Sequence, residues 1–264
     1  MDRNEAVLRE LNLYPQWVRR NPPAPEEPQS VRAELVEACP APTEIGGLCP
    51  STGSGRTEIN NTHTGSSAAV PASPVDNLGW QELKQQVRDC TACKLRAGCT
   101  QTVFGVGDEK ADWLFVGEGP GADEDAQGEP FVGQAGKLLD NMLLSIKLRR
   151  GKNVYIANIV KCRPPGNRTP EADEITTCLP YLQRQIELIK PKLIVALGKT
   201  AATVLLGRDA TLGSLRGTLH DYRGVPLLIT YHPAYLLRSP MEKAKAWQDL
   251  CLAMDTMQKL QGAA

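Results

Sequence analysis

Short apolar runs alternate with amphipathic stretches along the chain from Trp80 onward. Four of these runs are nearly continuous in hydrophobic residues, a pattern typical of β-strands that are covered on both faces. The four predicted strands are Trp113–Val116, Val154–Ala157, Leu193–Leu197 and Pro226–Thr230. The amphipathic stretches predict helices over Gln134–Leu148, Pro170–Ile189, Lys199–Leu206 and Pro240–Leu260. This alternation predicts a three-layer α/β/α fold around a central four-stranded parallel sheet.

The first 78 residues lack this pattern, apart from a short amphipathic helix predicted within residues 1–20. Nine of the 20 prolines fall between Asn21 and Leu78, among many serine, threonine and glycine residues. Such a composition buries too little apolar surface to offset the entropy lost on ordering. We therefore expect residues 1–78 to form a short helix and a disordered linker, and residues 79–264 to form one folded domain.

Charge restricts how the chain could bind nucleic acid. The formal net charge is zero and the isoelectric point is near 6.8, so any attraction to phosphate must come from a local patch. Such a patch lies between Lys147 and Arg168, where seven lysine or arginine residues occur without a single aspartate or glutamate. This run is either a phosphate-binding surface or a solvated face of the domain.

No apolar run approaches the roughly 18 residues that cross a bilayer, and the amino terminus has no apolar signal core. We therefore expect a cytoplasmic protein that does not bind membranes. The sequence carries no oligomerisation signal, so we expect a monomer. In a reducing compartment, eight cysteines favour metal or cluster ligation for some of them over a disulfide framework.

Two cysteine pairs surround the most motif-rich stretch of the chain. Cys90-x-x-Cys93 precedes it, and Cys162 and Cys178 follow it with fifteen residues between them. Four thiolates can hold a 4Fe-4S cluster or a structural zinc ion, and the spacing does not separate the two. Cys99 could compete as a ligand. The remaining cysteines are interpreted as incidental or as core residues; they are Cys39, Cys49 and Cys251.

Each predicted strand is followed at once by an unusual residue or motif. These are Gly117-Glu118-Gly119-Pro120-Gly121, then Asn158, then Gly198, then His232-Pro233. Ligands of open parallel sheets bind outside the carboxyl ends of the strands, so four separate segments are predicted to converge on one crevice.

The glycine-rich motif does not fit a dinucleotide or a phosphate well. It lacks the third glycine of the dinucleotide fingerprint, and the acidic residues after it would repel phosphate. A neutral, planar ligand suits it better, with Phe131 as a stacking face or else a core residue. The amide of Asn158 can donate and accept hydrogen bonds as a nucleobase edge requires, unless it only forms a turn. His232 is one of three histidines, and its position after the last strand makes it a candidate functional group.

Taken together, four segments of the chain resemble the family 4, iron–sulfur members of the uracil-DNA glycosylase superfamily. The segments are Gly117-Glu-Gly-Pro-Gly-Ala-Asp-Glu-Asp, Pro130-Phe-Val-Gly-Gln-Ala-Gly, Asn158-Ile-Val-Lys-Cys-Arg-Pro-Pro and His232-Pro-Ala-Tyr-Leu-Leu-Arg. The resemblance covers about Trp80 to Leu260 and includes the cysteine spacing, but it does not reach about the first 75 residues.

The resemblance implies a monofunctional DNA repair enzyme of base excision repair. It would hydrolyse the N-glycosidic bond of deoxyuridine in single- or double-stranded DNA, releasing uracil and leaving an abasic site. Phe131 would stack on the flipped uracil, and Asn158 would bind its O4 and N3–H edge. His232, with backbone amides around Glu118 and Gly119, would stabilise the departing uracil anion.

The water-activating group is less well defined by the resemblance. Better known uracil-DNA glycosylases carry an aspartate in the first motif, where this chain has Gly117-Glu118-Gly119-Pro120. Glu118 and Glu124 are the candidate carboxylates, and the sequence does not rank them. A related group traps its substrate through a histidine in a basic loop. Because residues 163–173 contain no histidine, we expect turnover instead.

The resemblance also implies a cofactor and a DNA surface. Cys90, Cys93, Cys162 and Cys178 would ligate a structural 4Fe-4S cluster, and Cys99 would not. The cluster would hold the basic segment in place, and the implied DNA contacts there are Lys161, Arg163 and Arg168. Leu237 and Arg238 belong to a second segment, which resembles the one that family members insert into the space left by the flipped base.

Two alternatives stay open. The same fold could act on another deaminated base, such as hypoxanthine or xanthine, which predicts weak discrimination at Asn158. A different class of protein, a non-catalytic nucleic-acid-binding module on a four-cysteine metal site, would use the glycine loop only to shape the fold. This module would not need Asn158, Phe131 and His232 to converge on one crevice.

Overall fold

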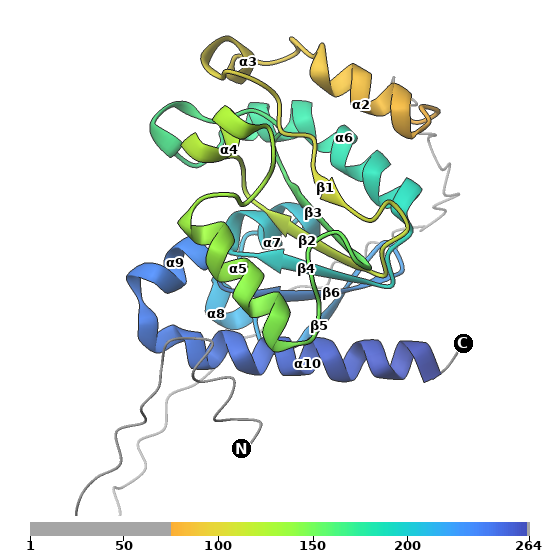
Figure 1. Cartoon of the computed structure of the whole chain (residues 1–264), viewed down its shortest axis with the longest axis vertical. Helices are drawn as coiled ribbons and strands as arrows, with labels where there is room; N and C mark the ends of the chain where they lie inside the picture. Colours follow the sequence, from red (N-terminus) through yellow and green to blue (C-terminus); the bar gives the residue numbers. More distant parts are fainter. Residues whose placement is uncertain (1–74, 263–264) are drawn as a thin grey trace, which may run out of the picture. The chain divides into compact units, whose positions relative to one another are not determined.

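The computed structural model describes residues 75–262, which form a six-stranded sheet with helices on both faces (Figure 1). Along the sheet the strands are ordered β1-β3-β2-β4-β6-β5. Their bounds are β1 Val106–Gly107, β2 Trp113–Gly117, β3 Val154–Asn158, β4 Leu193–Leu197, β5 Leu219–Tyr222 and β6 Val225–Thr230. Every residue of β2, β3 and β4 is buried, as their continuous apolar sequences predict.

The longer helices pack against the two faces of this sheet. They are α2 Trp80–Arg88, α5 Gln134–Ser145, α6 Ala172–Ile189, α7 Lys199–Leu206 and α10 Lys243–Gly262. Shorter helical segments connect them: α3 Leu95–Gly98, α4 Ala122–Gln127, η1 Pro165–Asn167, α8 Leu212–Leu215, α9 Pro233–Arg238 and η2 Pro240–Glu242. One hydrophobic cluster lies under α2, α6 and α7, and a second lies under α5 and α10. Two clusters separated by one sheet make a three-layer arrangement.

The four predicted strands are present as β2, β3, β4 and β6, and they pair in parallel. The prediction of a four-stranded sheet is wrong, however, because antiparallel strands extend it at both edges. β1 is two residues long, and β5 alternates exposed and buried residues with polar side chains. Neither strand has the continuous apolar run that identifies the central four.

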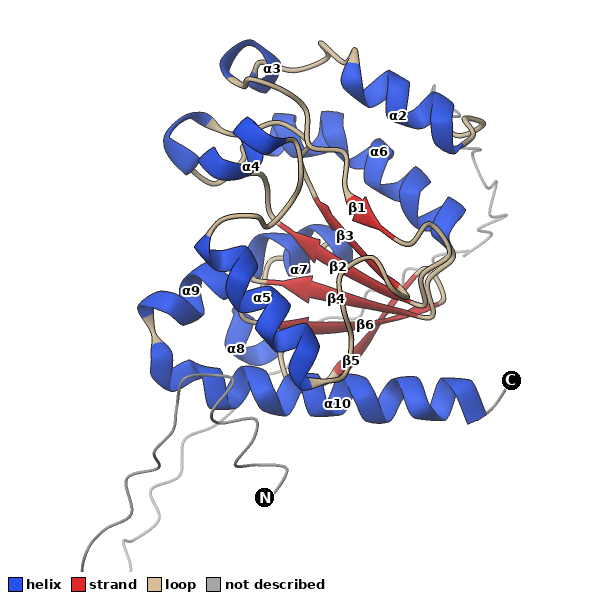
Figure 2. Cartoon of the chain, in the orientation of Figure 1, coloured by secondary structure: helices blue, strands red, loops and turns tan. Residues whose placement is uncertain are grey.

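The order of the parallel strands creates a crevice at their carboxyl ends. The chain passes from β2 to β3 on one side and then crosses to β4 on the other side of β2. In Figure 2 the arrowheads of β2, β4 and β6 point toward the same edge of the sheet. Connections diverge at such a reversal of strand order, which leaves room for a ligand there.

The described residues start close to the predicted domain boundary. Val75 is 3% exposed and belongs to the cluster under α2, so the packed core begins slightly before residue 79. The predicted helix in residues 1–20, the predicted linker up to residue 74, Cys39 and Cys49 lie outside the described residues. Among the helices between residues 75 and 262, none is long and apolar enough to span a membrane.

Candidate active site

A pocket of about 470 Å³ opens at the carboxyl ends of the parallel strands. The glycine-rich loop after β2, the end of β3 and the start of α9 all contribute to its lining. Of the residues singled out from the sequence, it brings together Glu118, Gly119, Glu124, Phe131, Asn158, Arg168, His232 and Arg238. Three of the four segments expected to converge therefore line this pocket, although they lie more than a hundred residues apart at the extremes. The fourth, Gly198, packs against His232 and lines a neighbouring pocket with Glu118 and His232.

Asn158 lies at the base of this pocket, as the last residue of β3. It is 2% exposed and pairs in register with Gly117 of β2. Its Oδ1 is buried and accepts no hydrogen bond from any residue in 75–262. Because a buried polar atom without a partner costs about 1–3 kcal/mol, this oxygen is suited to accept a hydrogen bond from a ligand.

Gly117 allows the pocket to be this narrow. A Cβ atom at this position would lie 2.4 Å from Asn158 Oδ1 and 2.6 Å from Phe131 Cζ. Carbon atoms do not approach neighbours so closely, so any side chain here would displace the amide, the ring or both. The glycine after β2 therefore serves close packing between Asn158 and Phe131, and this requirement differs from that of a phosphate-binding loop.

Phe131 and His232 are in ring contact in the lining of the pocket. Their ring centroids are 5.5 Å apart and their planes are inclined by 32°. Phe131 is 6% exposed and comes from the loop between α4 and α5, whereas His232 is the N-cap of α9. A planar ligand bound between Asn158 and His232 would thus lie against the face of an aromatic ring.

The protonation state of His232 follows from its surroundings. Burial, together with the nearby charge of Arg238, lowers its pKa from 6.5 to about 4, and Glu124 opposes the shift. Its Nδ1 accepts a hydrogen bond of 3.2 Å from the Ala234 amide. At neutral pH the imidazole is therefore uncharged, and its single proton is on Nε2, which can donate to a ligand.

The two candidate carboxylates have different partners. Glu124 accepts a backbone N–H from Gly121 on Oε2 at 3.0 Å, and from Val132 and Gly133 on Oε1 at 2.9 and 3.0 Å. Its side chain therefore ties the glycine-rich loop to the loop that carries Phe131. Glu118 accepts a hydrogen bond of 2.5 Å from Thr200 Oγ1 on Oε2, and it lines the pocket directly.

The four predicted cysteine ligands line one small cavity between α2, α3 and α6. The Lys161 amide donates to Cys178 Sγ at 3.3 Å, and the Tyr181 hydroxyl donates to Cys90 Sγ at 3.3 Å. N–H and O–H donors to sulfur are typical of cluster sites, so the donor set fits an iron–sulfur group. Within residues 75–262, no three cysteine, histidine, aspartate or glutamate side chains are grouped closely enough to hold a single metal ion.

Cys99 lies beside this set but does not line the cavity. Burial, and then a hydrogen bond with the Cys99 side chain, raises the pKa of the Cys162 thiol. Arg96 Nη1 in turn approaches Cys99, at 3.3 Å from its carbonyl oxygen and 3.7 Å from its sulfur. The fifth cysteine therefore has partners of its own within the loop.

Lys161 requires a correction to the predicted DNA surface. It is 1% exposed, and its Nζ donates to the Asn158 carbonyl at 3.0 Å and to Gln185 Oε1 at 2.6 Å. Burial lowers its pKa to about 8. Its side chain points into the protein and is not part of an exposed basic surface. Lys161 instead fixes the end of β3, from which Asn158 enters the pocket.

The other predicted DNA contacts lie at or near the surface, and Arg168 is committed to an internal partner. Arg163 Nε donates to Asn167 Oδ1 at 2.8 Å in the exposed loop. Arg168 forms a two-pronged pair with Glu174, with Nη1–Oε2 at 2.9 Å and Nη2–Oε1 at 2.7 Å. In α9, Leu237 is 44% exposed and Arg238 is also exposed, whereas the preceding Leu236 is core.

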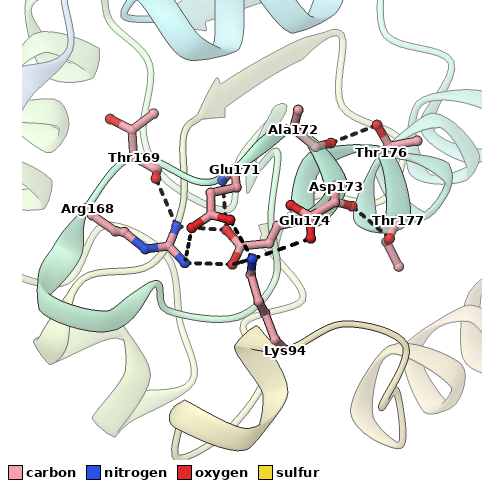
Figure 3. Close-up of polar contacts among 9 residues, drawn as sticks. All are labelled: Lys94, Arg168, Thr169, Glu171, Ala172, Asp173, Glu174, Thr176 and Thr177. Carbon is pink, nitrogen blue, oxygen red and sulfur yellow. Dashed lines mark hydrogen bonds and ion pairs between the residues drawn. The ribbon is translucent and has the colours of Figure 1, made fainter.

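Figure 3 shows that Arg168 and Lys94 approach the same group of carboxylates at the start of α6. Lys94 follows Cys93 directly and pairs with Glu171, and it lies 3.4 Å from Asp173 Oδ2 and 3.8 Å from Glu174 Oε1. Ion pairs between Lys94 and these carboxylates thus connect the Cys90–Cys93 turn to α6, the helix that carries Cys178.

Sequence reasoning did not identify two residues that contact the site. Thr200 donates a hydrogen bond to Glu118. Gln185 accepts a hydrogen bond from Lys161 on Oε1, and its Nε2 donates to the Phe104 carbonyl at 3.0 Å. Thr200 could have been found, because it follows Gly198 at the carboxyl end of β4. Gln185 gives no such signal, since it is an ordinary helical residue whose partners lie far away in the sequence.

Comparisons with known proteins agree on one family. The family model described as Uracil DNA glycosylase superfamily matches residues 104–251. A protein of Pyrobaculum aerophilum named Type-4 uracil-DNA glycosylase is 44% identical over 183 residues, which cover 66% of this chain and 93% of that protein. Proteins with the same name from Archaeoglobus fulgidus and Thermotoga maritima are 44% and 46% identical. Each match covers 60% of this chain, and 83% and 82% of the respective relatives.

Proposed function

The chain belongs to the uracil DNA glycosylase superfamily, and on that basis we propose that it removes uracil from DNA. The reaction is hydrolysis of the N-glycosidic bond of deoxyuridine, which releases uracil and leaves an abasic site. The observation that carries the proposal is the buried Oδ1 of Asn158, which has no hydrogen-bond partner among residues 75–262 and lies in a pocket lined by Phe131 and His232. The target nucleotide must leave the base stack to reach such a pocket.

Asn158 reads the base. Its Oδ1 accepts the N3–H of uracil and its Nδ2 donates to O4, while Phe131 stacks on the ring. Cytosine presents the opposite pattern, an acceptor at N3 and a donor at position 4. Each mismatched buried group costs about 1–3 kcal/mol, so the two positions together favour uracil strongly.

His232 stabilises the leaving group. Breaking the glycosidic bond moves negative charge onto the uracil ring, and the Nε2–H of a neutral imidazole donates to O2 as that charge develops. The low pKa of His232 supports this role, because the ring is neutral at physiological pH and holds no second proton that it could transfer to the departing base. Backbone amides near Glu118 and Gly119 add further donors.

Glu118 positions the attacking water. It lines the pocket and has one oxygen held by Thr200, which leaves the other oxygen available for water. Glu124 is less suited to this task because three backbone amides occupy its two oxygens. We assign Glu124 to holding the loop that carries Phe131.

DNA contacts come from residues beside the pocket, of which Leu237 and Arg238 are exposed and Arg163 is half-buried. Arg163 and Arg238 bind phosphates, and the exposed Leu237 fills the space left by the flipped base. Arg168 lines the pocket, but its pairing with Glu174 makes it chiefly a residue that shapes the loop.

We further propose that Cys90, Cys93, Cys162 and Cys178 hold a 4Fe-4S cluster. The support is that these four thiols line one cavity and that backbone and tyrosine donors point at two of the sulfurs. When bound, the cluster links three segments of the chain and supplies no step of the hydrolysis. The Lys161 amide then connects one ligand, Cys178, to the segment that follows Asn158.

Analysis of iron and acid-labile sulfide in the purified chain tests this assignment, with Cys93→Ser and Cys99→Ser as a matched pair. We expect the wild type to be brown and to contain both elements, Cys93→Ser to lose them, and Cys99→Ser to keep them. Zinc in place of iron, or loss of the cluster on replacing Cys99 but not Cys93, would contradict the assignment.

Methylated uracils test the recognition by Asn158. 1-Methyluracil keeps the N3–H, whereas 3-methyluracil replaces it with a methyl group. We expect uracil and 1-methyluracil to inhibit cleavage of uracil-containing DNA, and 3-methyluracil to inhibit at least about tenfold more weakly. Asn158→Ala should lose this discrimination. Equal inhibition by both methylated bases in the wild type would show that Oδ1 does not read N3.

A further inference from the structure

The segment that carries Phe131 has an unusual backbone. Phe131 has a φ of 56°, in the left-handed region that bulky residues seldom adopt. The direction of its ring over the pocket depends on this conformation. Backbone conformations of this kind persist only when surrounding groups hold them.

Arg150 contributes hydrogen bonds that hold the backbone of this segment in place. Its Nη1 donates to the Pro130 carbonyl and its Nη2 to the Phe131 carbonyl, each at 2.7 Å. Asp140 of α5 orients the guanidinium, with Oδ1 at 3.1 Å from Nε and 3.0 Å from Nη2. The Arg150 side chain is 22% exposed, so most of it is enclosed by the loop that it binds.

The opposite polar groups of the same segment are held by Glu124. Pro130 and Phe131 present carbonyl oxygens to the cation of Arg150, and Val132 and Gly133 present amides to the anion of Glu124. Two charged side chains therefore hold four consecutive residues: the Arg150 cation binds the carbonyl oxygens of the first two, and the Glu124 anion binds the amides of the last two.

Close packing leaves the Phe131 carbonyl little room to move. A Cβ atom on Gly136, in the first turn of α5, would lie 1.7 Å from the Phe131 oxygen. The carbonyl therefore occupies space that a side chain at position 136 would fill. Movement of the peptide away from the guanidinium would be limited by α5 itself.

We propose that Arg150 is a positioning residue for uracil stacking, which acts by fixing the backbone of Phe131; this inference rests on the proposed function. Arg150 belongs to the basic run between Lys147 and Arg168, where a phosphate contact would be the usual interpretation. Its donors are directed at two backbone carbonyls and at the half-exposed Asp140 carboxylate, all groups of the protein itself. Its role is therefore in base recognition and not in DNA affinity.

Arg150→Lys and Arg150→Met separate these two roles. A lysine keeps the charge but cannot bind two carbonyls in the planar geometry of a guanidinium. We expect both variants to lower kcat for uracil release by a similar factor of about 10–100, since small misplacements of a binding group have effects of that size. If Arg150 contacts a phosphate instead, lysine should largely restore activity.

The salt dependence of DNA binding is a second test. It should not change if Arg150 only positions Phe131, because no phosphate contact is then lost. Loss of one phosphate contact reduces the slope of log K against log salt by about one. We expect Arg150→Met to leave the slope for a uracil-free duplex unchanged. Arg149→Met, which removes an exposed charge next to it, calibrates what the loss of one surface charge does in the same assay. A reduced slope in Arg150→Met would overturn the inference.

A double-mutant cycle tests whether Arg150 acts through Phe131. In a Phe131→Ala background, Arg150→Lys should lower kcat by less than about twofold further, because the ring it positions is absent. Independent, multiplied effects would mean that Arg150 acts elsewhere. If Arg150→Lys does not fold, Asp140→Asn loosens the same guanidinium and should show the same coupling with a smaller loss.

The proposed function and this inference can fail separately. If the wild-type, full-length chain releases no uracil, the proposed function fails. If the wild type releases uracil and Arg150→Lys does so at the same rate, only the positioning role of Arg150 fails.

Discussion

At the scale of single residues, the chemistry of the pocket depends on which polar atoms have partners inside the protein. Asn158 Oδ1 has none within residues 75–262, and His232 has its Nδ1 occupied by the Ala234 amide, so both present one defined group to a ligand. Glu124 has both oxygens occupied. The sequence predicts the residue types, but it does not predict these partners, because the packing of separate loops decides them.

The low pKa of His232 predicts the pH dependence of activity. Burial holds its folded-state pKa near 4, below the usual 6.5, so the neutral form persists through mildly acidic pH. We expect kcat/KM for uracil release to show no ionisation near pH 6.5 that depends on this residue. A pH–rate profile of the wild type and of His232→Gln checks this. A fall centred near 6.5 that disappears in the variant would contradict it.

The same group affects stability with a defined sign. The unfolded chain takes up a proton on His232 near pH 6.5, whereas the folded protein does so only near pH 4. Stability from the neutral ring is therefore complete above pH 6.5 and is lost as pH falls toward 4. Denaturation at several pH values should show a shallower loss across this window in His232→Gln than in the wild type.

Glu118 and Glu124 should respond differently to the same substitution. Glu118→Gln should lower kcat by about 10²–10⁴-fold with little change in stability, because it removes a pocket carboxylate. Glu124→Gln should lower both stability, by about 1–3 kcal/mol, and activity, because it disturbs three backbone hydrogen bonds. Kinetics and thermal denaturation of both variants test these expectations. The reverse pattern would mean that Glu124, and not Glu118, positions the attacking water.

At the scale of elements, charged side chains determine how α6 begins. The predicted start was Pro170, but the helix begins at Ala172 because Glu171 and Glu174 form a capping box, with the Glu171 amide donating to Glu174 Oε2 at 2.7 Å. The same Glu174 binds Arg168, and Lys94 lies beside it. The start of α6 therefore joins the loop after Cys162 to the turn that contains Cys93.

Replacing Glu174 should weaken that junction. Its side chain is fully buried, and its hydrogen bonds with Arg168 lower its pKa to about 2. We expect Glu174→Gln to cost about 1–3 kcal/mol at neutral pH. The stability supplied by the carboxylate is present above pH 4.5 and is lost as pH falls toward 2, so the variant should show a smaller acid-induced loss.

Asp173→Asn is the control for this measurement. Asp173 is 67% exposed and its nearest approach to Lys94 Nζ is 3.4 Å, so its removal should change stability by less than about 1 kcal/mol. Denaturant unfolding measures the loss of stability in both variants. Equal losses would mean that the total negative charge at the start of α6 matters and that the specific pairing of Glu174 with Arg168 does not.

At the scale of the whole molecule, the central sheet could be predicted and its edges could not. The buried parallel strands are continuous apolar runs, which the sequence displays directly. β5 was missed because its four residues alternate exposed positions with less exposed ones and form no continuous apolar run. The sequence held one signal, Gly224. It and Arg223 are the two residues between β5 and β6, and both have positive φ, which a two-residue hairpin turn requires and which glycine adopts readily.

Lys161 is the clearest error in the predicted site, and its cause also lies at this scale. Lysine is usually exposed, and the neighbouring charges suggested a surface. The residues around Lys161 are Ile159, Val160 and Cys162, all buried, because the chain continues from β3 beneath α6. The apolar neighbours were visible in the sequence, but the internal acceptors for the ammonium, Asn158 O and Gln185 Oε1, were not.

Release of free uracil from a uracil-containing oligonucleotide, by the cluster-loaded wild type and by Asn158→Ala in parallel, tests the central claim most directly. We predict rapid release by the wild type, little release of hypoxanthine from a matched substrate, and a decrease of about 10²–10⁴-fold in kcat/KM for the variant, as expected for loss of two buried hydrogen bonds. Absence of uracil release by the wild type, or equal rates for the two proteins, would contradict the account.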